Sequence, residues 1–398
     1  MKNILILGFG KTGEATYKCL KNKGNLFIVD DNEKNPNYDV LTTKEFLKKD
    51  INLDLIVKSP GIKLNHEILI KYKNVEIIND IELAYLIVKD KNIKIIGVTG
   101  TNGKTSTTML ITKILQKAGY QAFACGNIGV SPLDIIREQQ NIDYLIMELS
   151  SFQLLDIKTF CCDVALILNI NDDHLDYHYN FNHYYEAKLN IIKNIPRLKI
   201  LITPLDIKKE GLTVLSYLKK DIDKKNNSLS YENIYLVLQL LKVLGIDEIY
   251  LKEVLANNEL NLPHRMEYVD KILGVNYIND SKATNMSATI NCLNQFNNII
   301  LLVGGYDKKE KMDEIKKYYN KIKQVIAFGE NKYSFDFIPG IIYTTNMQEA
   351  FLIAQKIAKN NDNVILSPAS ASLDQFPNYI ERGNKFKKLV RKLNENNN

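Results

Sequence analysis

The chain has 398 residues, of which 45% are hydrophobic and 25% charged, and its formal net charge is +6. These proportions are typical of a globular protein, and at about 150 residues per domain the length predicts two or three domains. The excess positive charge is spread as isolated lysines and short pairs, so it does not indicate nucleic acid binding. The five cysteines show no CxxC spacing, which argues against a zinc site or a disulfide framework.

The sequence also offers no membrane signal. No apolar run approaches the ~20 residues of a membrane-spanning helix. The first residues lead directly into ILILGFG, which is too short for the apolar part of a signal peptide. We therefore expect a cytoplasmic protein with no membrane partner. Nothing indicates an obligate interface, so we expect a monomer.

The first region, expected over residues 1–90, opens with a dinucleotide-type fingerprint. A predicted strand ends in Gly8-x-Gly10-x-x-Gly13, and a second strand ends in Asp30. In such motifs a diphosphate binds at the helix N-terminus and the carboxylate binds a ribose or a base. A later strand ends at Ser59-Pro60-Gly61, the end where such sheets bind ligands. An NAD-linked oxidoreductase stays an alternative, and the glycines could also serve tight turns alone.

The second region, expected over residues 91–261, opens with IIGVTGTNGKTSTT. A β-branched run ends in Gly100-x-x-Gly103-Lys104-Thr105, and hydroxyl residues then open a helix. Glycines let the backbone approach a phosphate, the lysine adds a positive charge, and the threonine hydroxyl can bind Mg²⁺. The strict motif would have glycine at Val98, where this chain uses Gly100 instead. The pattern predicts an ATP site, the alternative being an ordinary strand-to-helix turn.

Two further strands of this region end in ligand-type side chains. YLIMELSSFQL places Glu148 at the end of an apolar strand, where it can hold Mg²⁺ or cap a helix. After the apolar strand of VALILNINDDHLDYH, polar residues gather at Asn169, Asp172, Asp173, His174, Asp176 and His178. Spacing does not decide which of them bind a ligand and which cap the next helix. Lys188 follows among apolar neighbours, a pattern that by itself favours a surface lysine.

The third region, expected over residues 262–398, follows an apparent linker at LNLPHRMEYV. It alternates strands and helices around INDSKATN, NNIILLVGGYDK and NVILSPASASLDQF, which predicts a third parallel sheet. The expected fold class is therefore α/β with three domains. The first and third are Rossmann-like, and the central one is a P-loop ATPase-like domain with a mostly parallel sheet.

Motifs from all three regions together resemble those of the Mur ligases of peptidoglycan synthesis. They are TGTNGKTSTT, GNIG, ELSSFQL, NDDHLDYH, YEAKL, LPHRMEYV, NDSKATN, LVGGYDK and LSPASASLDQF. ELSSFQL and SPASASLDQF favour the branch that adds D-glutamate. The resemblance implies an ATP-dependent amide ligase whose small-molecule substrates are UDP-N-acetylmuramoyl-L-alanine and D-glutamate. ATP would convert the substrate carboxylate to an acyl phosphate, which the amine then attacks, so the site must supply cations and oriented donors.

The resemblance also implies roles for individual residues. Lys104 and the loop amides would hold the β and γ phosphates, and CO₂ would carbamylate Lys188, which requires a free amine with a depressed pKa. The catalytic residues would be Lys104, Glu148, His174 and Lys188. Two Mg²⁺ sites would involve Thr105, Glu148, His174 and Lys188. The nucleotide would contact Gly100, Thr101, Asn102, Gly103, Lys104, Thr105, Ser106, Asn233, Arg265 and Asp280.

Substrate residues are implied in the same way. The UDP end would bind Lys11, Thr12, Asp30 and Gly61, and Asn127 would touch the same substrate. The D-glutamate pocket would contain Lys282, Thr284, Lys308, Ser372, Leu373 and Tyr379. One departure concerns adenine, because Leu229 and Ser230 stand where the family commonly has His and Asn before Asn233. A folylpolyglutamate synthase is disfavoured by the GxGxxG region, and a silent nucleotide-binding protein by the presence of the metal and phosphate residues.

Overall fold

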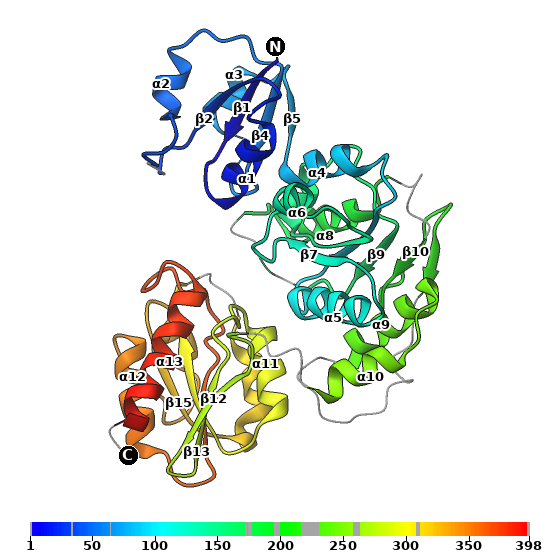
Figure 1. The fold of residues 1–398 in the computed structure, drawn as a ribbon. Coiled ribbons are helices and arrows are strands. Elements are labelled where there is room, and N and C mark those ends of the chain that lie inside the picture. The colour runs from blue at the N-terminus through cyan, green and yellow to red at the C-terminus, as the bar shows by residue number, and fades with distance from the viewer. Residues whose placement is uncertain are drawn as a thin grey trace. The chain divides into compact units, whose positions relative to one another are not determined.

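The protein is described by a computed structural model that covers residues 2–32, 35–63, 65–171, 173, 177–194, 200–215, 231–257, 263–307 and 311–395. Within these ranges, three sheets flanked by helices confirm the predicted α/β class (Figure 1). The described residues pack as two compact units, one made of those up to residue 257 and the other of those from residue 263 onward. The first two predicted regions thus lie in one unit, and their boundary at residue 90 stays a prediction.

The first sheet is wholly parallel, in the order β3-β2-β1-β4-β5. Its strands are β1 (Asn3–Leu7), β2 (Asn25–Val29), β3 (Val40–Leu41), β4 (Leu55–Lys58) and β5 (Glu76–Ile78). Its helices are α1 (Lys11–Leu20), α2 (Thr43–Leu47), α3 (Glu67–Lys71) and α4 (Asp80–Val88). Continuous apolar strands suit a sheet covered on both faces. The strand order reverses between β1 and β4, which places the fingerprint loop and the Ser59–Gly61 turn at one switch point.

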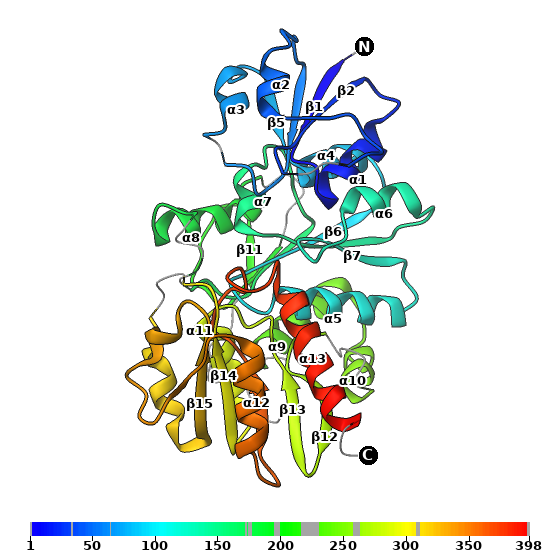
Figure 2. The ribbon, with the colours of Figure 1, turned by 90° about the vertical axis from the view of Figure 1, so that its left-hand side faces the viewer.

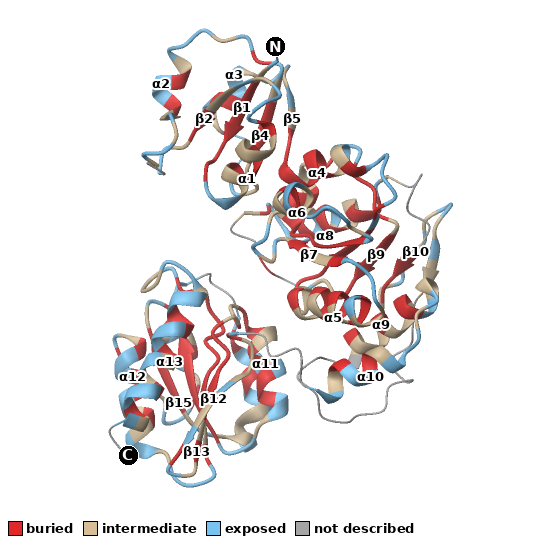
Figure 3. Cartoon of the chain, in the orientation of Figure 1, coloured by how far each residue is buried: buried red, intermediate tan, exposed pale blue. Residues whose placement is uncertain are grey.

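The second sheet is also parallel, in the order β11-β10-β9-β6-β8-β7. Its strands are β6 (Lys94–Thr99), β7 (Ala122–Gly126), β8 (Tyr144–Glu148), β9 (Val164–Ile167), β10 (Ile200–Ile202) and β11 (Thr213–Leu215). The helices are α5 (Lys104–Lys117), α6 (Pro132–Glu138), α7 (Ser151–Leu155), α8 (Phe181–Leu189), the 3₁₀ helix η1 (Asn190–Ile192), α9 (Tyr231–Leu244) and α10 (Ile249–Ala256). Figure 3 shows the buried residues concentrated in the strands of this sheet.

The first two sheets share a packed interface. Helices α1 and α6 lie side by side in both views (Figure 1, Figure 2), and Leu133 of α6 joins a cluster with Ile4, Ala15 and Leu20. The carboxylate of Glu82 on α4 accepts hydrogen bonds from the backbone amides of residues 158–160 at 2.8–2.9 Å. A ligand lying between the two sheets would therefore meet a preformed surface.

The third sheet has the order β12-β13-β17-β14-β15-β16. Its strands are β12 (Glu267–Ile272), β13 (Val275–Asn279), β14 (Ile299–Gly304), β15 (Ile322–Phe328), β16 (Ile342–Tyr343) and β17 (Asn363–Leu366). Its helices are α11 (Met286–Gln295), α12 (Met347–Ile357) and α13 (Tyr379–Glu395), with 3₁₀ helices η3 (Asp313–Lys321) and η4 (Lys332–Phe335).

The prediction of a purely parallel third sheet is wrong at one edge. β12 runs antiparallel to β13, and the end of the apparent linker belongs to β12. The reason is a two-residue turn at Leu273 and Gly274, whose φ angles of +49° and +79° suit a tight hairpin. The remaining strands are parallel, as predicted.

Candidate active site

The phosphate loop lies between β6 and α5, as the sequence predicted. Gly100 and Gly103 have φ angles of +154° and +83°, which side-chain-bearing residues rarely adopt. A Cβ on Gly103 would stand 2.2 Å from Nδ2 of Asn233, so the predicted adenine-side residue packs directly against the loop. Gly103 is the N-cap of α5 and has no side chain with which to cap the helix, and helix N-termini of this kind attract anions.

The polypeptide after β9 holds this loop in place. The amide of Thr101 donates to the carbonyl of Asn169, and the amide of Asn102 donates to its side-chain oxygen, both at 2.9 Å. Asn169 returns a hydrogen bond from Nδ2 to the carbonyl of Asn102 at 3.1 Å. Asn169 belongs to the polar cluster seen in the sequence but was not predicted as a site residue. Its position directly after an apolar strand was the available signal.

Two lysines converge on the loop. Nζ of Lys104 donates to the carbonyls of Gly100 and Thr101 at 2.8 Å, and Nζ of Lys188 donates to the carbonyl of Gly100 at 2.9 Å. Lys188 is 2% exposed, so the surface alternative does not hold. Burial, followed by the charge of Lys104, lowers the pKa of Lys188 well below its ordinary value, while Asp173 and Glu148 oppose this shift. These surroundings favour the neutral amine.

Glu148 is the last residue of β8 and pairs with Val98 of β6, two residues before Gly100. Its Oε1 accepts a hydrogen bond from Nδ2 of Asn127 at 2.8 Å, whereas the buried Oε2 has no hydrogen-bond partner among the described residues. A buried carboxylate oxygen without a donor is costly, and a divalent cation would satisfy it. Together with the Thr105 hydroxyl, this oxygen fits Mg²⁺ chemistry.

The structure describes only part of the predicted metal-binding set. The described residues contain no group of three or more His, Cys, Asp or Glu side chains suited to a metal ion. His174, the residue predicted to bind a second Mg²⁺, lies outside the described residues.

A cavity of about 350 Å³ opens between the first two sheets. Three predicted substrate residues, Lys11, Thr12 and Asn127, line it, and Pro60, the neighbour of Gly61, does so too. Asp30 binds instead to the backbone, accepting hydrogen bonds from the amides of residues 9 and 32 at 2.6 and 2.8 Å. Because Asn127 also binds Glu148, the cavity adjoins the candidate metal site.

Asp80, which sequence reasoning missed, lines the same cavity. It is 2% exposed, and its Oδ1 has no hydrogen-bond partner among the described residues. Burial raises the pKa of Asp80 to about 6, although neighbouring amides, Gln153 and Lys58 oppose the shift. Its signal in the sequence was only its place at the start of a helix, where acids are common.

Residues predicted for the amino-acid pocket lie together in the second unit. Nζ of Lys282 lies 5.3 Å from the centre of the Tyr379 ring, and the amide of Thr284 donates to the Lys282 carbonyl at 2.9 Å. Ser372 is buried and its neighbour Leu373 is exposed. Lys308 lies outside the described residues.

The predicted nucleotide residues of this unit are close to each other. Asp280 accepts hydrogen bonds from the Met266 amide at 3.1 Å and the Ser367 hydroxyl at 2.7 Å. Burial raises the pKa of Asp280 to about 6, and the charge of Arg265 acts in the opposite direction. Nε of Arg265 is buried without a hydrogen-bond partner among the described residues.

The fold and the site define a multidomain α/β enzyme of the P-loop nucleotide-binding class. Comparison with known families narrows this class. Residues 98–252 match the Mur ligase middle domain, and residues 264–370 match the domain described as "Mur ligase, glutamate ligase domain". The chain belongs to the Mur ligase family, and the oxidoreductase alternative is wrong.

Relatives match over nearly the whole chain. The UDP-N-acetylmuramoylalanine–D-glutamate ligase of Rickettsia bellii is 35% identical, over 99% of this chain and 98% of that protein. The enzyme of the same name from Bacillus cereus is 32% identical, over 98% of each. Among solved structures, the MurF ligase of Thermotoga maritima in complex with ADP superimposes with a TM-score of 0.64 at 18% identity, covering 98% of this chain and 96% of that one. In the described part of the chain, no helix has the length and apolar character to cross a membrane.

Proposed function

We propose that the protein is an ATP-dependent amide ligase that joins D-glutamate to UDP-N-acetylmuramoyl-L-alanine through an acyl phosphate. The observation that carries the reaction class is the convergence of Lys104 and Lys188 on the phosphate loop, with Glu148 near enough to act on the charge of Lys188. The choice of substrates is supported by relatives of that name along 98–99% of the chain. A folylpolyglutamate synthase from Yersinia pestis shares the fold, but it matches over only 79% of this chain.

The chemistry starts with ATP at the N-terminus of α5. Lys104 would give up its hydrogen bonds to the loop carbonyls and bind the β and γ phosphates instead. Residues Gly100–Ser106 would surround the same phosphates. Bound Mg²⁺, held by Thr105 and Glu148, with a second ion at His174, would neutralise charge where the two anions meet. A carboxylate oxygen of the substrate attacks the γ-phosphorus and ADP leaves. The amine of D-glutamate then attacks the acyl carbon, loses a proton, and expels phosphate.

Lys188 would act as a carbamate. Its neutral amine would add to CO₂ and release a proton, so that a buried neutral group becomes an anion that could help to hold Mg²⁺. The depressed pKa of Lys188 supports this reaction, because only the free amine is nucleophilic.

The substrates would bind at separate places. The UDP end would lie against Lys11, Thr12, Asp30 and Gly61, with the acyl end near Asn127 and the metal ions. The amino acid would bind Lys282, Thr284, Lys308, Ser372, Leu373 and Tyr379. Arg265 and Asp280 would contact the nucleotide, with Asn233 near adenine. We further propose that the protein acts as a cytoplasmic monomer.

The test is phosphate release from ATP with UDP-N-acetylmuramoyl-L-alanine and one amino acid at a time. We expect release with D-glutamate and little with L-lysine or meso-diaminopimelate. The proposal is overturned by no release with D-glutamate, or by equal release with the other amino acids.

A further inference from the structure

Arg382, on α13, is the largest fully buried side chain among the described residues, and its surroundings are unusual. Buried guanidinium groups commonly pair with a carboxylate. Here the four hydrogen bonds of the side chain all go to neutral oxygens. Burial lowers the pKa of Arg382 to about 9, and Asp374 and Asp280 oppose the shift only as more distant charges. Burying this cation therefore costs free energy, which calls for an explanation other than stability.

The four acceptors belong to two different loops. Nε donates to Oγ of Ser281 at 3.1 Å, and Nη2 donates to the carbonyl of the same residue at 2.9 Å. Nη2 also donates to the carbonyl of Ser370 at 2.9 Å, and Nη1 donates to that of Ala371 at 3.1 Å. One planar group thus joins the loop after β13 to the loop after β17.

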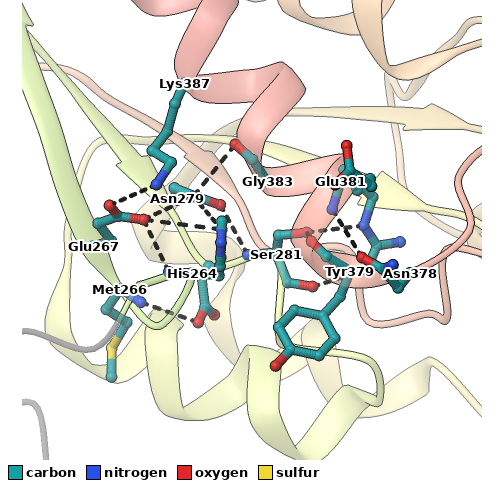
Figure 4. A network of polar contacts seen from close by, with 12 residues as sticks. His264, Met266, Glu267, Asn279, Ser281, Asn378, Tyr379, Glu381, Gly383 and Lys387 are labelled. Carbon is teal, nitrogen blue, oxygen red and sulfur yellow. Dashed lines mark hydrogen bonds and ion pairs between the residues drawn. The ribbon is translucent and has the colours of Figure 1, made fainter. Parts of the chain in front are cut away.

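The start of α13 is tied to the same group. The hydroxyl of Ser281 donates to the carbonyl of Tyr379 at 2.8 Å, and Figure 4 shows these two residues together at the first turn of the helix. Every described residue predicted for the amino-acid pocket lies in one of these three segments or directly beside it. They are Lys282, Thr284, Ser372, Leu373 and Tyr379.

The loop after β17 is held in a conformation that it would not adopt readily. Ala369 is buried with φ at +56°, a value that costs a residue with a side chain about 1 kcal/mol or more. On the other side of the loop, the amide of Tyr306 donates to the carbonyl of Ala371 at 2.9 Å. A strained loop persists only where its surroundings determine it, and Arg382 supplies two of the hydrogen bonds that do so.

We propose that Arg382 is a positioning residue for the amino-acid pocket, which it assembles by fixing two loops of the third sheet and the start of α13 relative to one another. It touches the pocket only through these loops, and the identity of the amino acid rests on the proposed function. Loss of this geometry displaces the amine from the acyl carbon, and misplacement of about 1 Å can cost about 100-fold in rate.

The main test is Arg382→Lys, because lysine keeps the charge but cannot supply a planar fork of donors. We expect the KM for D-glutamate to rise about 10-fold or more, with the KM for UDP-N-acetylmuramoyl-L-alanine unchanged. Arg391→Lys, an exposed site on the same helix, is the matched control and should change neither value. An unchanged KM for D-glutamate in a folded Arg382→Lys protein would overturn the inference.

A second variant covers the case in which Arg382→Lys does not fold. Ser281→Ala removes the hydroxyl that links the guanidinium to Tyr379 while leaving the buried charge in place. We expect a smaller rise in the KM for D-glutamate, and no rise would count against the inference.

A readout that needs no activity separates this inference from the proposed function. In Arg382→Lys, amide hydrogen exchange should accelerate in residues 280–284 and 368–373 together, while β14 and β15 keep their protection. Faster exchange across the whole unit would indicate that Arg382 has a merely structural role. Unchanged exchange in both loops would indicate that it does not position them. If wild-type protein has no ligase activity, the proposed function fails and the exchange result still decides the role of Arg382.

Discussion

Lys188 has its amine inside the protein, bonded to a loop carbonyl and 4.6 Å from the centre of the Tyr184 ring. The hydroxyl of that tyrosine lies 3.0 Å from Oγ1 of Thr101, so the phosphate loop and the lysine share one set of contacts. A cation is poorly stabilised at this place, and an anion made from the amine would face Lys104. The chemistry of this lysine is therefore set by its neighbours.

We expect Lys188→Ala to lower activity by about 10-fold to 100-fold, which is the range for loss of groups that orient metal ligands. Short-chain carboxylic acids should restore part of the activity, because a free carboxylate can occupy the place of the carbamate. Phosphate release measures both effects. Lys193→Ala, an exposed lysine nearby, is the control, and full activity of Lys188→Ala would refute the carbamate.

Asp80 gives a prediction for stability against pH. Its pKa rises from 3.8 to about 6 in the folded protein, so the folded state holds its proton more tightly than the unfolded chain does. Its contribution to stability is complete below pH 3.8 and is lost as the pH rises through 6. At about 1.36 kcal/mol per pH unit, the difference amounts to about 3 kcal/mol.

Asp80→Asn removes this titration. We expect the free energy of unfolding of the variant, relative to wild type, to increase by up to about 3 kcal/mol between pH 4 and pH 7, as measured by urea denaturation. Asp134→Asn, a partly exposed acid lining the same cavity, should show little change. Parallel pH profiles for wild type and Asp80→Asn would show that Asp80 is not the titrating group.

At the scale of elements, α5 has a glycine at each end, and the two glycines have similar φ angles but different surroundings. Gly119 follows the end of α5 with φ at +90°, and no described atom lies within 4 Å of the position of its Cβ. Gly103 has a similar φ of +83°, but its Cβ would collide with Asn233. A comparison of substitutions at these two glycines therefore separates the effect of backbone strain from the effect of crowding by a neighbouring side chain.

Gly103→Ala should weaken ATP binding about 10-fold or more, because both the loop and Asn233 must move, and 1.4 kcal/mol is already a factor of ten. Gly119→Ala should cost about 1 kcal/mol of stability and leave ATP binding unchanged. Calorimetric titration with ATP and thermal unfolding measure the two effects. Equal ATP affinities for the two variants would contradict the role given to Asn233.

At the scale of the whole molecule, one buried ion pair links the first sheet to the second. Nζ of Lys58, at the end of β4, lies 2.7 Å from the carboxylate of Asp156, and their side chains are 0% and 8% exposed. The same ammonium donates to the carbonyl of Ile62 at 2.8 Å, so the turn beside the cavity is anchored to it. Burial raises the pKa of Asp156 despite the attraction of Lys58, which indicates that the pair contributes little net stability.

Removing one partner of this ion pair should destabilise the protein, because it leaves a buried charge unpaired. Asp156→Asn should lower the free energy of unfolding by about 3–5 kcal/mol and raise the KM for the UDP substrate. Glu248→Gln, which breaks an exposed pair with Lys252, should change stability by no more than about 1 kcal/mol. Similar losses in the two variants, measured by urea denaturation, would show that the buried pair does not join the sheets.

The amino-acid sequence by itself determined the α/β class, the ATP loop and the order of the three sheets. These features depend on local periodicity and on backbone conformations that only particular residues permit, so they can be read from short stretches. The family resemblance predicts that Lys11, Thr12 and Asn127 bind one substrate, and all three line the cavity. The tertiary structure alone decided the antiparallel edge of the third sheet and the surroundings of Asn169, Asp80 and Arg382. The reason is physical: whether a charged or polar side chain is buried, and which oxygens it meets, depends on segments that are 67 residues away for Asn169 and 101 for Arg382.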